Sequence, residues 1–465
     1  MKTTHQTKQT KKKESTANSG SFGNIIITLI KFSLPLILSG VLQQLYNWAD
    51  AFIVGNAEGE LALAAVGSTT TAVNFYVTAI TGFTLGLNIF FAQKYGSGET
   101  ERIPRILAVF LFFLGGIILV LSALGMWLAA PLLELLRTTP DTITMAESYL
   151  RIVLAGMPFL AVYNVYSAAL RGIGDSRAPF YAVLLSSAVN VALDIVFVVF
   201  LGLSVAGAAM ATVFSQAAMT VFLVCYSIRK YRVLRFRVRD GLFRRSDRGL
   251  LAAGCRLAIP PMIQSNITSA GNLILQNFMN GFGTQTVAAI TTAYRIDTIV
   301  LLPIINLGSG ISTLTAQKYG AGETKSAGRI LSAGAIVMAG VSLLLTLLVI
   351  PTGGRLIALF GAGEEAVSIG ENFFLRIASF YVIYGLATAV RGYVEGLGDV
   401  LYSSAAGIAS LLFRIGASYA AVSVFANMVI AYAEAFSWVL LLILYLIRLV
   451  MLKRRTAEKK REFLS

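Results

Sequence analysis

The sequence predicts an all-α polytopic membrane protein with twelve transmembrane helices in two bundles of six. Its composition, its regular apolar runs and an internal repeat support this prediction. Of the 465 residues, 56% are hydrophobic and only 13% are charged, and the mean hydropathy is +0.74. A typical soluble domain carries about 25% charged residues. Because so few polar side chains could not cover the surface of a soluble protein, we expect the lipid bilayer to surround the chain.

Apolar segments of spanning length follow one another along almost the whole chain. A bilayer core about 30 Å thick requires roughly 20 mainly apolar residues per helix. Such segments predict twelve spans, at 24–54, 61–91, 106–130, 143–170, 179–201, 206–228, 250–280, 286–316, 330–350, 366–390, 401–421 and 428–449. The predicted parts are a disordered cytoplasmic tail at 1–23, a six-helix N-terminal lobe at 24–228, a basic cytoplasmic linker at 229–249, a six-helix C-terminal lobe at 250–449 and a basic cytoplasmic tail at 450–465.

The distribution of Lys and Arg predicts the orientation of these spans. Short loops rich in Lys and Arg stay on the cytoplasmic side of a membrane. With the N-terminus inside, residues 229–248 contain nine bases and the tail from Arg448 contains seven, whereas the outer loops contain only Arg137 and Arg355. We therefore expect a multi-pass protein of the cytoplasmic membrane with both termini in the cytoplasm.

The composition also excludes several classes of function. His5 is the single histidine, and Cys225 and Cys255 form no CxxC motif, so histidine-based catalysis, histidine metal sites and a disulfide framework are not expected. The net charge of +15 could suit nucleic acid, but the chain lacks the long polar faces that nucleic-acid binding needs. An intramembrane enzyme would need a nucleophile with a matched base, and none is evident. We predict no enzyme, no nucleic-acid partner and no cofactor.

The two halves of the chain are copies of each other. Residues 92–100 read AQKYGSGET and residues 316–324 read AQKYGAGET. At the same offset, Gly-Ile-Gly-Asp at 172–175 matches Gly-Leu-Gly-Asp at 396–399. Because each half has six spans, both halves insert with the same orientation, and parallel repeats of this kind are a transporter architecture. We expect a binding site between the lobes and alternating access to it.

Acidic residues inside the predicted spans are candidate functional groups, because a charge at the bilayer centre costs at least about 2.5–3.5 kcal/mol. Asp50, Asp194 and Thr212 lie at similar depths in the outer half of the membrane. Asn190 and Asp194 share one helix face, and so do three residues of the first helix, Gln43, Tyr46 and Asp50. Two adjacent carboxylates either share a proton or hold a cation with oxygen ligands. The alternative is that they only cap or pair with their neighbours.

The C-terminal lobe departs from this pattern. Asn190 corresponds at the repeat offset to Arg414 and Met210 to Glu434, so a base and an acid stand at matched depth and can pair. Such a pair is either structural or part of substrate binding. Asp297 either attracts cationic substrates to a central cavity or serves packing.

Pro35 lies inside the first predicted helix, the one that carries Asp50. Proline removes a backbone hydrogen bond and kinks a helix. Pro35 is therefore a candidate hinge, with a tolerated transmembrane proline as the alternative.

A set of these residues resembles one known transporter family. The set comprises the Pro35 helix with Gln43 and Tyr46, Asp-Ala-Phe-Ile-Val-Gly at 50–55, the two AQKYG loops, Leu-Arg-Gly-Ile-Gly-Asp at 170–175, and Asn190 with Asp194. Over 32–449 the chain resembles the multidrug and toxic compound extrusion (MATE) transporters, closest to their prokaryotic DNA-damage-inducible-protein-F-like branch. The resemblance implies a V-shaped transporter that exports organic, often cationic compounds in exchange for sodium ions or protons.

The resemblance also implies roles for individual residues. It implies a cation-coupling site, with sodium as one candidate ion, at Asp50, Asn190, Asp194 and Thr212. It also implies that Gln43 and Tyr46 line the substrate cavity and that Pro35 is a bending point of the first helix. Some branches carry a carboxylate on helix seven, but Gln264-Ser265-Asn266-Ile267-Thr268 has none, so coupling is expected through the N-terminal lobe.

The sequence thus predicts a monomeric secondary antiporter for small organic substrates, coupled to protons or sodium ions. The alternative is a related flippase for lipid-linked precursors. A flippase would need several cationic groups in the cavity to hold a pyrophosphate, and Arg414 is the one good candidate. Asp297, Arg414 and Glu434 complete the residues expected at the substrate cavity.

Overall fold

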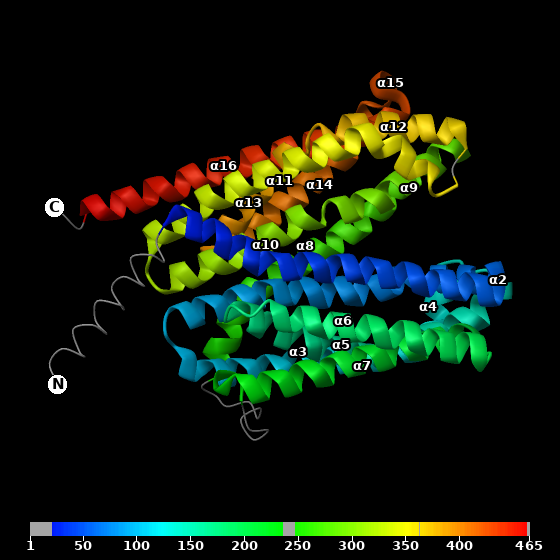
Figure 1. Cartoon of the computed structure of the whole chain (residues 1–465), viewed down its shortest axis with the longest axis horizontal. Coiled ribbons are helices and arrows are strands. Elements are labelled where there is room, and N and C mark those ends of the chain that lie inside the picture. The colour runs from blue at the N-terminus through cyan, green and yellow to red at the C-terminus, as the bar shows by residue number, and fades with distance from the viewer. Residues whose placement is uncertain (1–20, 236–246, 362, 463–465) are drawn as a thin grey trace. The chain divides into compact units, whose positions relative to one another are not determined.

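Figure 1 shows the computed structural model, which describes residues 21–235, 247–361 and 363–462. Within these ranges every regular element is a helix. The predicted tail at 1–23, linker at 229–249 and tail at 450–465 fall wholly or partly outside the described residues, so their predicted disorder and location stay predictions. For residues 455–462 only the backbone is described.

The helices fall where the apolar segments predict them. The first half of the chain forms α2 (Phe22–Gly96), η1 (Thr100–Arg102), α3 (Ile103–Trp127), α4 (Ala129–Leu135), α5 (Pro140–Gly172), α6 (Arg177–Asp194), the π-helix η2 (Ile195–Phe200), α7 (Ser204–Lys230) and η3 (Arg232–Leu234). The second half forms α8 (Arg248–Asn280), α9 (Thr284–Val300), α10 (Leu302–Gly320), α11 (Thr324–Ala358), α12 (Glu364–Ala378), α13 (Tyr381–Gly396), α14 (Val400–Ala420), α15 (Val422–Phe425), η6 (Ala426–Met428) and α16 (Val429–Glu462).

Nine helices among the described residues are long and apolar enough to cross a membrane, and the pair α12 and α13, bent by 46°, provides a tenth span. Two further spans complete the predicted twelve. The 75-residue α2 is interrupted at Gly59, whose φ of 83° only glycine adopts readily, and therefore provides two spans. The 33-residue α8 is less apolar but long enough to cross.

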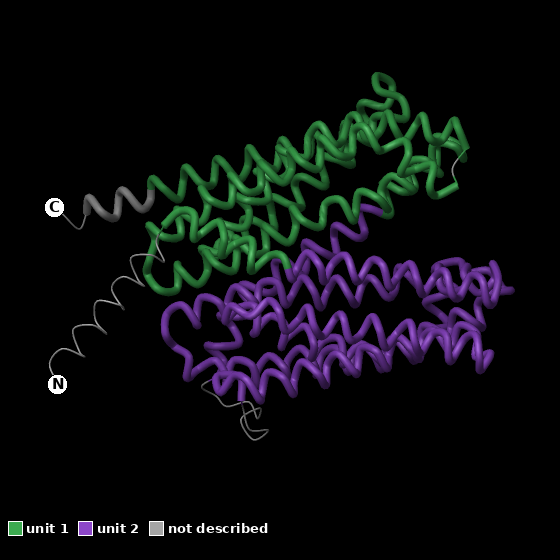
Figure 2. The backbone as a smooth tube through the Cα atoms, viewed as in Figure 1, with its two compact units in different colours: residues 1–34, 273–465 green, residues 35–272 purple. Residues whose placement is uncertain are grey.

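The helices form two compact units, shown in Figure 2. One unit comprises 35–272, and the other comprises 1–34 and 273–465. The predicted lobes at 24–228 and 250–449 follow the sequence repeat instead, and their boundaries stay a prediction. The difference arises because the first turns of α2 pack within the second unit: a Cβ atom on Gly310 of α10 would lie 2.2 Å from Ser33 Oγ.

Helix α5 organises the core of the unit that comprises 35–272. It packs against α3 and α7, and α7 packs in turn against α6 and η2 (Figure 1). Fully buried apolar side chains fill the space between α2, α3 and α5, among them Phe91, Phe110 and Leu154. This packing gives α6 and α7 a fixed support.

The repeated AQKYG loops fold alike. In each loop a lysine pairs with the glutamate five residues later, Lys94 with Glu99 at 2.7 Å and Lys318 with Glu323 at 2.8 Å. The hydrogen bond from its lysine lowers the pKa of each glutamate. The second glycine of each loop also has the same backbone conformation, because Gly98 and Gly322 have φ values of 77° and 75°. The sequence repeat is thus a structural repeat at these loops.

The aspartate of each Gly-x-Gly-Asp motif ties neighbouring helices together. Asp175 Oδ1 accepts hydrogen bonds from the first backbone amides of α6, and its Oδ2 accepts one from Tyr231 Oη at 2.7 Å. Burial opposes ionisation of Asp175, but these hydrogen bonds and the charge of Lys230 lower its pKa overall. In the second half Asp399 pairs with Arg448 of α16. Each motif therefore joins the start of one helix to the last long helix of its half.

The close approach of α2 to α8 at Gly86 generates a prediction about stability. A Cβ atom there would lie 1.9 Å from the Leu257 carbonyl oxygen and 2.7 Å from the Ala258 Cα, so backbone would have to move. We expect Gly86→Ala to lower the free energy of unfolding by about 1–3 kcal/mol, measured by thermal unfolding in detergent. Gly116→Ala is the control, because no atom lies within 4 Å of a Cβ there. Equal melting temperatures for the two variants would contradict this packing.

Candidate functional site

Two membrane-embedded carboxylates come together in the unit that comprises 35–272. Asp50 is supplied by α2, and Asp194 is the last residue of α6. The two carboxyl groups lie close enough to interact electrostatically. Asp194 is fully buried, and Asn190, one turn earlier on α6, is 1% exposed. The structure therefore brings together Asp50 and Asp194, two of the three residues that the sequence placed at similar depth on separate helices.

The backbone around Asp194 is unusual for a transmembrane helix. The α-helix ends at Asp194, and the chain continues as the π-helix η2. A π-helical turn shifts the hydrogen-bond register and is found frequently at functional sites. The amide of Ile195, at this junction, already bonds within the helix. The wider turn thus directly follows the carboxylate.

The polar atoms of this cluster are buried without partners. Both carboxylate oxygens of Asp194, both polar side-chain atoms of Asn190, and Asp50 Oδ1 are inaccessible and make no hydrogen bond within the described part of the chain. A buried polar group without a partner costs about 1–3 kcal/mol, and a charged one costs more. Because two neighbouring carboxylates cannot both stay ionised unaided in a low-dielectric setting, the cluster requires a proton or a cation.

Tyr46 and Tyr149 interact electrostatically with the carboxylates, and Tyr149 was not predicted from the sequence. Tyr149 of α5 interacts electrostatically with both Asp50 and Asp194 and with Tyr46. Tyr163, about four turns further along α5, interacts with Tyr46 in turn. No sequence spacing links α5 to α2, so only the fold reveals Tyr149 and Tyr163. Tyr46 itself lies one turn before Asp50 and was predicted.

The remaining predicted residues of this unit, Thr212 and Gln43, make no hydrogen bond to the carboxylate of Asp194. Thr212 of α7 is half-buried, and its hydroxyl donates to the Ala208 carbonyl oxygen at 3.1 Å, which leaves its lone pairs available. Gln43 is exposed on α2. Neither side chain hydrogen-bonds to Asp194. The predicted roles of Gln43 and Thr212 stay predictions.

The donor atoms suit a hard monovalent cation or a proton. Two carboxylates, the Asn190 amide oxygen and a hydroxyl are all oxygen ligands. Among the described residues there is no group of three or more His, Cys, Asp or Glu side chains that could hold a metal ion. The unpartnered oxygens of Asp194 are acceptor atoms that the described residues leave unsatisfied, and the predicted role of Asp194 in ion binding stays a prediction.

The other unit holds a different charged cluster. Arg414 Nη2 lies 2.9 Å from Glu434 Oε2, and Tyr294 Oη bridges them, accepting from Arg414 at 2.8 Å and donating to Glu434 at 2.9 Å. Asp297 is buried, accepts a hydrogen bond from Tyr381, and interacts electrostatically with Glu434 and Arg414. Arg414 and Glu434, which their matched depths allowed to pair, therefore do form an ion pair. Whether these three residues contact substrate stays a prediction.

Removing the base from this cluster should destabilise the protein. In Arg414→Met the largely buried Glu434 carboxylate keeps no cationic partner, so we expect a loss of about 3–5 kcal/mol in the free energy of unfolding. The double variant Arg414→Met/Glu434→Leu should regain most of it, as measured by denaturant unfolding in detergent. Arg355→Met, at an exposed base of α11, is the control. If the single and double variants unfold alike, the account of the pair is wrong.

Comparison with known proteins places this arrangement in one family. The MatE family model matches residues 35–196 and 260–420, one match in each half of the chain. The probable multidrug resistance protein YpnP of Bacillus subtilis is 31% identical over 383 residues, covering 82% of this chain and 84% of YpnP. The probable multidrug resistance protein NorM of Thermotoga maritima is 24% identical over 383 residues, covering 80% of each.

Solved structures show the same fold. An outward-facing multidrug resistance MATE family transporter of the MOP superfamily superposes with a TM-score of 0.86 at 22% identity, covering 94% of this chain and 97% of that chain. A MATE protein in the bent conformation superposes with a TM-score of 0.84 at 21% identity, covering 92% and 96%. The predicted fold class is confirmed, while the DNA-damage-inducible-protein-F-like branch stays a prediction. With both halves matched and a relative above 30% identity, the chain belongs to the MatE family of multidrug efflux transporters.

Proposed function

We propose that this protein is a secondary antiporter that exports small organic, often cationic compounds in exchange for protons or sodium ions. The main support is the carboxylate pair of Asp50 and Asp194, in which both oxygens of Asp194 and Oδ1 of Asp50 are inaccessible and lack hydrogen-bond partners among the described residues. A purely structural helix bundle gains nothing from such a pair, because its burial costs free energy. A coupling site needs it, because the ion must bind and leave.

Coupling requires that the ion and the substrate favour different conformations. A ligand shifts a conformational equilibrium only by its differential affinity for the two states. An ion or proton bound between Asp50 and Asp194 neutralises their charge and relieves their repulsion. It would thereby favour the conformation in which these helices lie close and substrate is released outside. By linkage, substrate binding would then weaken ion binding by the same factor.

Pro35 is the proposed moving point of α2. The helix keeps helical dihedral angles at Pro35, and Ser39 Oγ donates to the Pro35 carbonyl oxygen at 2.8 Å. The boundary between the two compact units nevertheless falls between Leu34 and Pro35. A proline at this boundary, fifteen residues before Asp50, supports a hinge that responds to the state of the carboxylate.

The charge of the other unit bears on the choice between the two candidate functions. A flippase for lipid-linked precursors would need cationic groups free to hold a pyrophosphate. Arg414, the predicted candidate, already pairs with Glu434 and Tyr294. This favours export of neutral and cationic compounds. A relative in Shewanella oneidensis, 27% identical over 363 residues, is named FAD transporter. Because relatives thus differ in their named substrates, we base the proposed substrate class on the charged residues of this chain.

The proposed location is the cytoplasmic membrane with both termini inside, and the proposed functional unit is the monomer. The segments that the Lys and Arg count assigns to the cytoplasm contain the paired Lys94 and Lys318, whereas the count assigns only Arg137 and Arg355, the latter in the last turn of α11, to the outer side. Because the two halves of one chain already supply both repeats, alternating access needs no second copy.

Gradient-driven efflux tests the proposal. A fluorescent organic cation is loaded into proteoliposomes, and its release is followed under an imposed proton or sodium gradient. We expect one of the two gradients to drive release, and Asp50→Asn and Asp194→Asn each to slow it roughly tenfold or more because the ion no longer couples. Asp141→Asn, at an exposed acid in the first turn of α5, is the matched control.

Two outcomes would contradict the proposal. Release that neither gradient accelerates would exclude ion-coupled antiport of this substrate. Full activity in both Asp50→Asn and Asp194→Asn would remove the carboxylate pair from the coupling mechanism, provided that Asp141→Asn is also fully active.

A further inference from the structure

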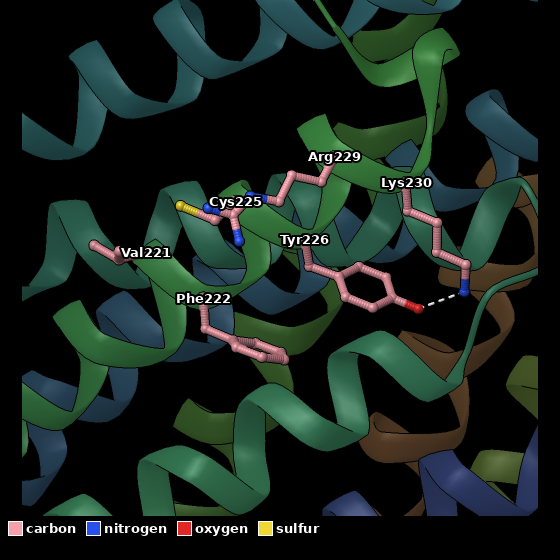
Figure 3. A pocket seen from close by; sticks show the side chains of 6 residues that line it. All are labelled: Val221, Phe222, Cys225, Tyr226, Arg229 and Lys230. Atoms are coloured by element: carbon pink, nitrogen blue, oxygen red, sulfur yellow. Dashed lines mark hydrogen bonds between the residues drawn. The ribbon is translucent and has the colours of Figure 1, made fainter.

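A groove on the surface of α7 lies apart from the carboxylate cluster. Its volume is about 420 Å³, and it is lined by Val221, Phe222, Cys225, Tyr226, Arg229 and Lys230 (Figure 3). Because successive pairs of these residues are four apart, they form one stripe along the helix. Apolar side chains line one end of the stripe, and two bases line the other.

The groove is remote from the proposed ion site. Cys225 lies thirteen positions after Thr212 on the same helix, which corresponds to about 20 Å along its axis. The basic end coincides with the end of α7 at Lys230. A ligand in this groove would therefore bind where α7 leaves the membrane, not where the ion is proposed to bind.

One cation of the groove is held in place. The Lys230 ammonium lies 3.3 Å from Asp175 Oδ2 and 4.8 Å from the centroid of the Tyr226 ring. Figure 3 shows the Tyr226 hydroxyl directed at this ammonium, while the Arg229 side chain extends to the other side. The Lys230 side chain is still 51% exposed. Its position is thus fixed, and its outer face remains open to a ligand.

Basic side chains outnumber the acidic side chains that pair with them at the end of α7. Arg229 is exposed and forms no ion pair with any residue that the structure describes. Arg232 and Arg235 follow within six residues and are also exposed. Against these four bases, Asp175 is the acid that pairs with the cluster. The end of α7 therefore carries an excess of positive charge directly beside an apolar groove.

From this juxtaposition we infer that the groove binds an anionic phospholipid, with an acyl chain along Val221, Phe222 and Cys225 and the phosphate at Arg229 and Lys230. Val221 is 60% exposed, so lipid can reach the apolar end. Clusters of bases where a helix leaves the membrane attract anionic headgroups. A lipid with no net charge would not match the excess of bases, and a free phosphate would leave the apolar groove unused. Assignment of this end of α7 to the inner leaflet rests on the proposed topology.

Lipid binding can be measured without transport. The full-length protein in detergent is mixed with equal amounts of phosphatidylglycerol and phosphatidylcholine, and bound lipid is counted by native mass spectrometry. We expect preferential binding of phosphatidylglycerol, and about a fivefold weaker affinity in Arg229→Gln, because one basic residue near a membrane surface contributes about that factor. Lys325→Gln is the matched control, since Lys325 is an exposed base outside the groove. Val221→Trp, which fills the apolar end, should also weaken binding.

Several outcomes would overturn this inference. Unchanged phosphatidylglycerol binding in both Arg229→Gln and Val221→Trp would remove the groove as the site. An equal loss in Lys325→Gln would indicate general attraction to surface charge. Competition by glycerol phosphate as strong as that by the intact lipid would show that the site takes free phosphate esters. Because this assay detects binding alone, its failure would leave the antiport proposal standing, and failure of efflux would leave the lipid result standing.

Discussion

The burial of unpartnered carboxylate oxygens is the constraint on which the rest of this structure depends. Asp194 is fully buried, and neither of its carboxylate oxygens has a hydrogen-bond partner within the described residues. A folded helix bundle tolerates such a group only if the remaining packing supplies the stability that it costs, or if a proton or cation completes it. The dense packing of α5 against α3 and α7 provides that support. The helices around Asp194 therefore hold its carboxylate in a fixed position without supplying it a hydrogen-bond donor.

The two halves of the chain differ in how their buried acidic side chains are neutralised. In one unit Asp50 and Asp194 face each other without a base. In the other, Arg414 and Tyr294 satisfy Glu434. The loops that bear Lys94 and Lys318 remain alike, whereas the membrane-embedded positions Asn190 and Arg414, which match at the repeat offset, differ. This asymmetry is consistent with an ion site in one unit and a structural cluster in the other.

Much of the fold could be predicted from the sequence, because spanning length and the repeat are local properties of the chain. The twelve segments and the break between the first two belong to this class, and the repeat offset also matched Arg414 with Glu434 in depth, so that they could pair. Contacts between helices do not, because membrane helices are apolar on lipid-facing and protein-facing sides alike. Phe52 is 70% exposed and Phe91 is fully buried, yet both lie in similarly apolar stretches of α2. For the same reason Tyr149 and the unit boundary at Pro35 became evident only in the structure.

Direct ion binding by the purified protein tests the central claim most closely. Radioactive sodium binding and proton uptake are each measured in detergent, on the native protein and on Asp194→Asn. We expect the native protein to bind one of these ions and Asp194→Asn to lose this binding. A transported substrate should displace the ion from the native protein. Ion binding that persists undiminished in Asp194→Asn would contradict the assignment of the carboxylate pair as the coupling site.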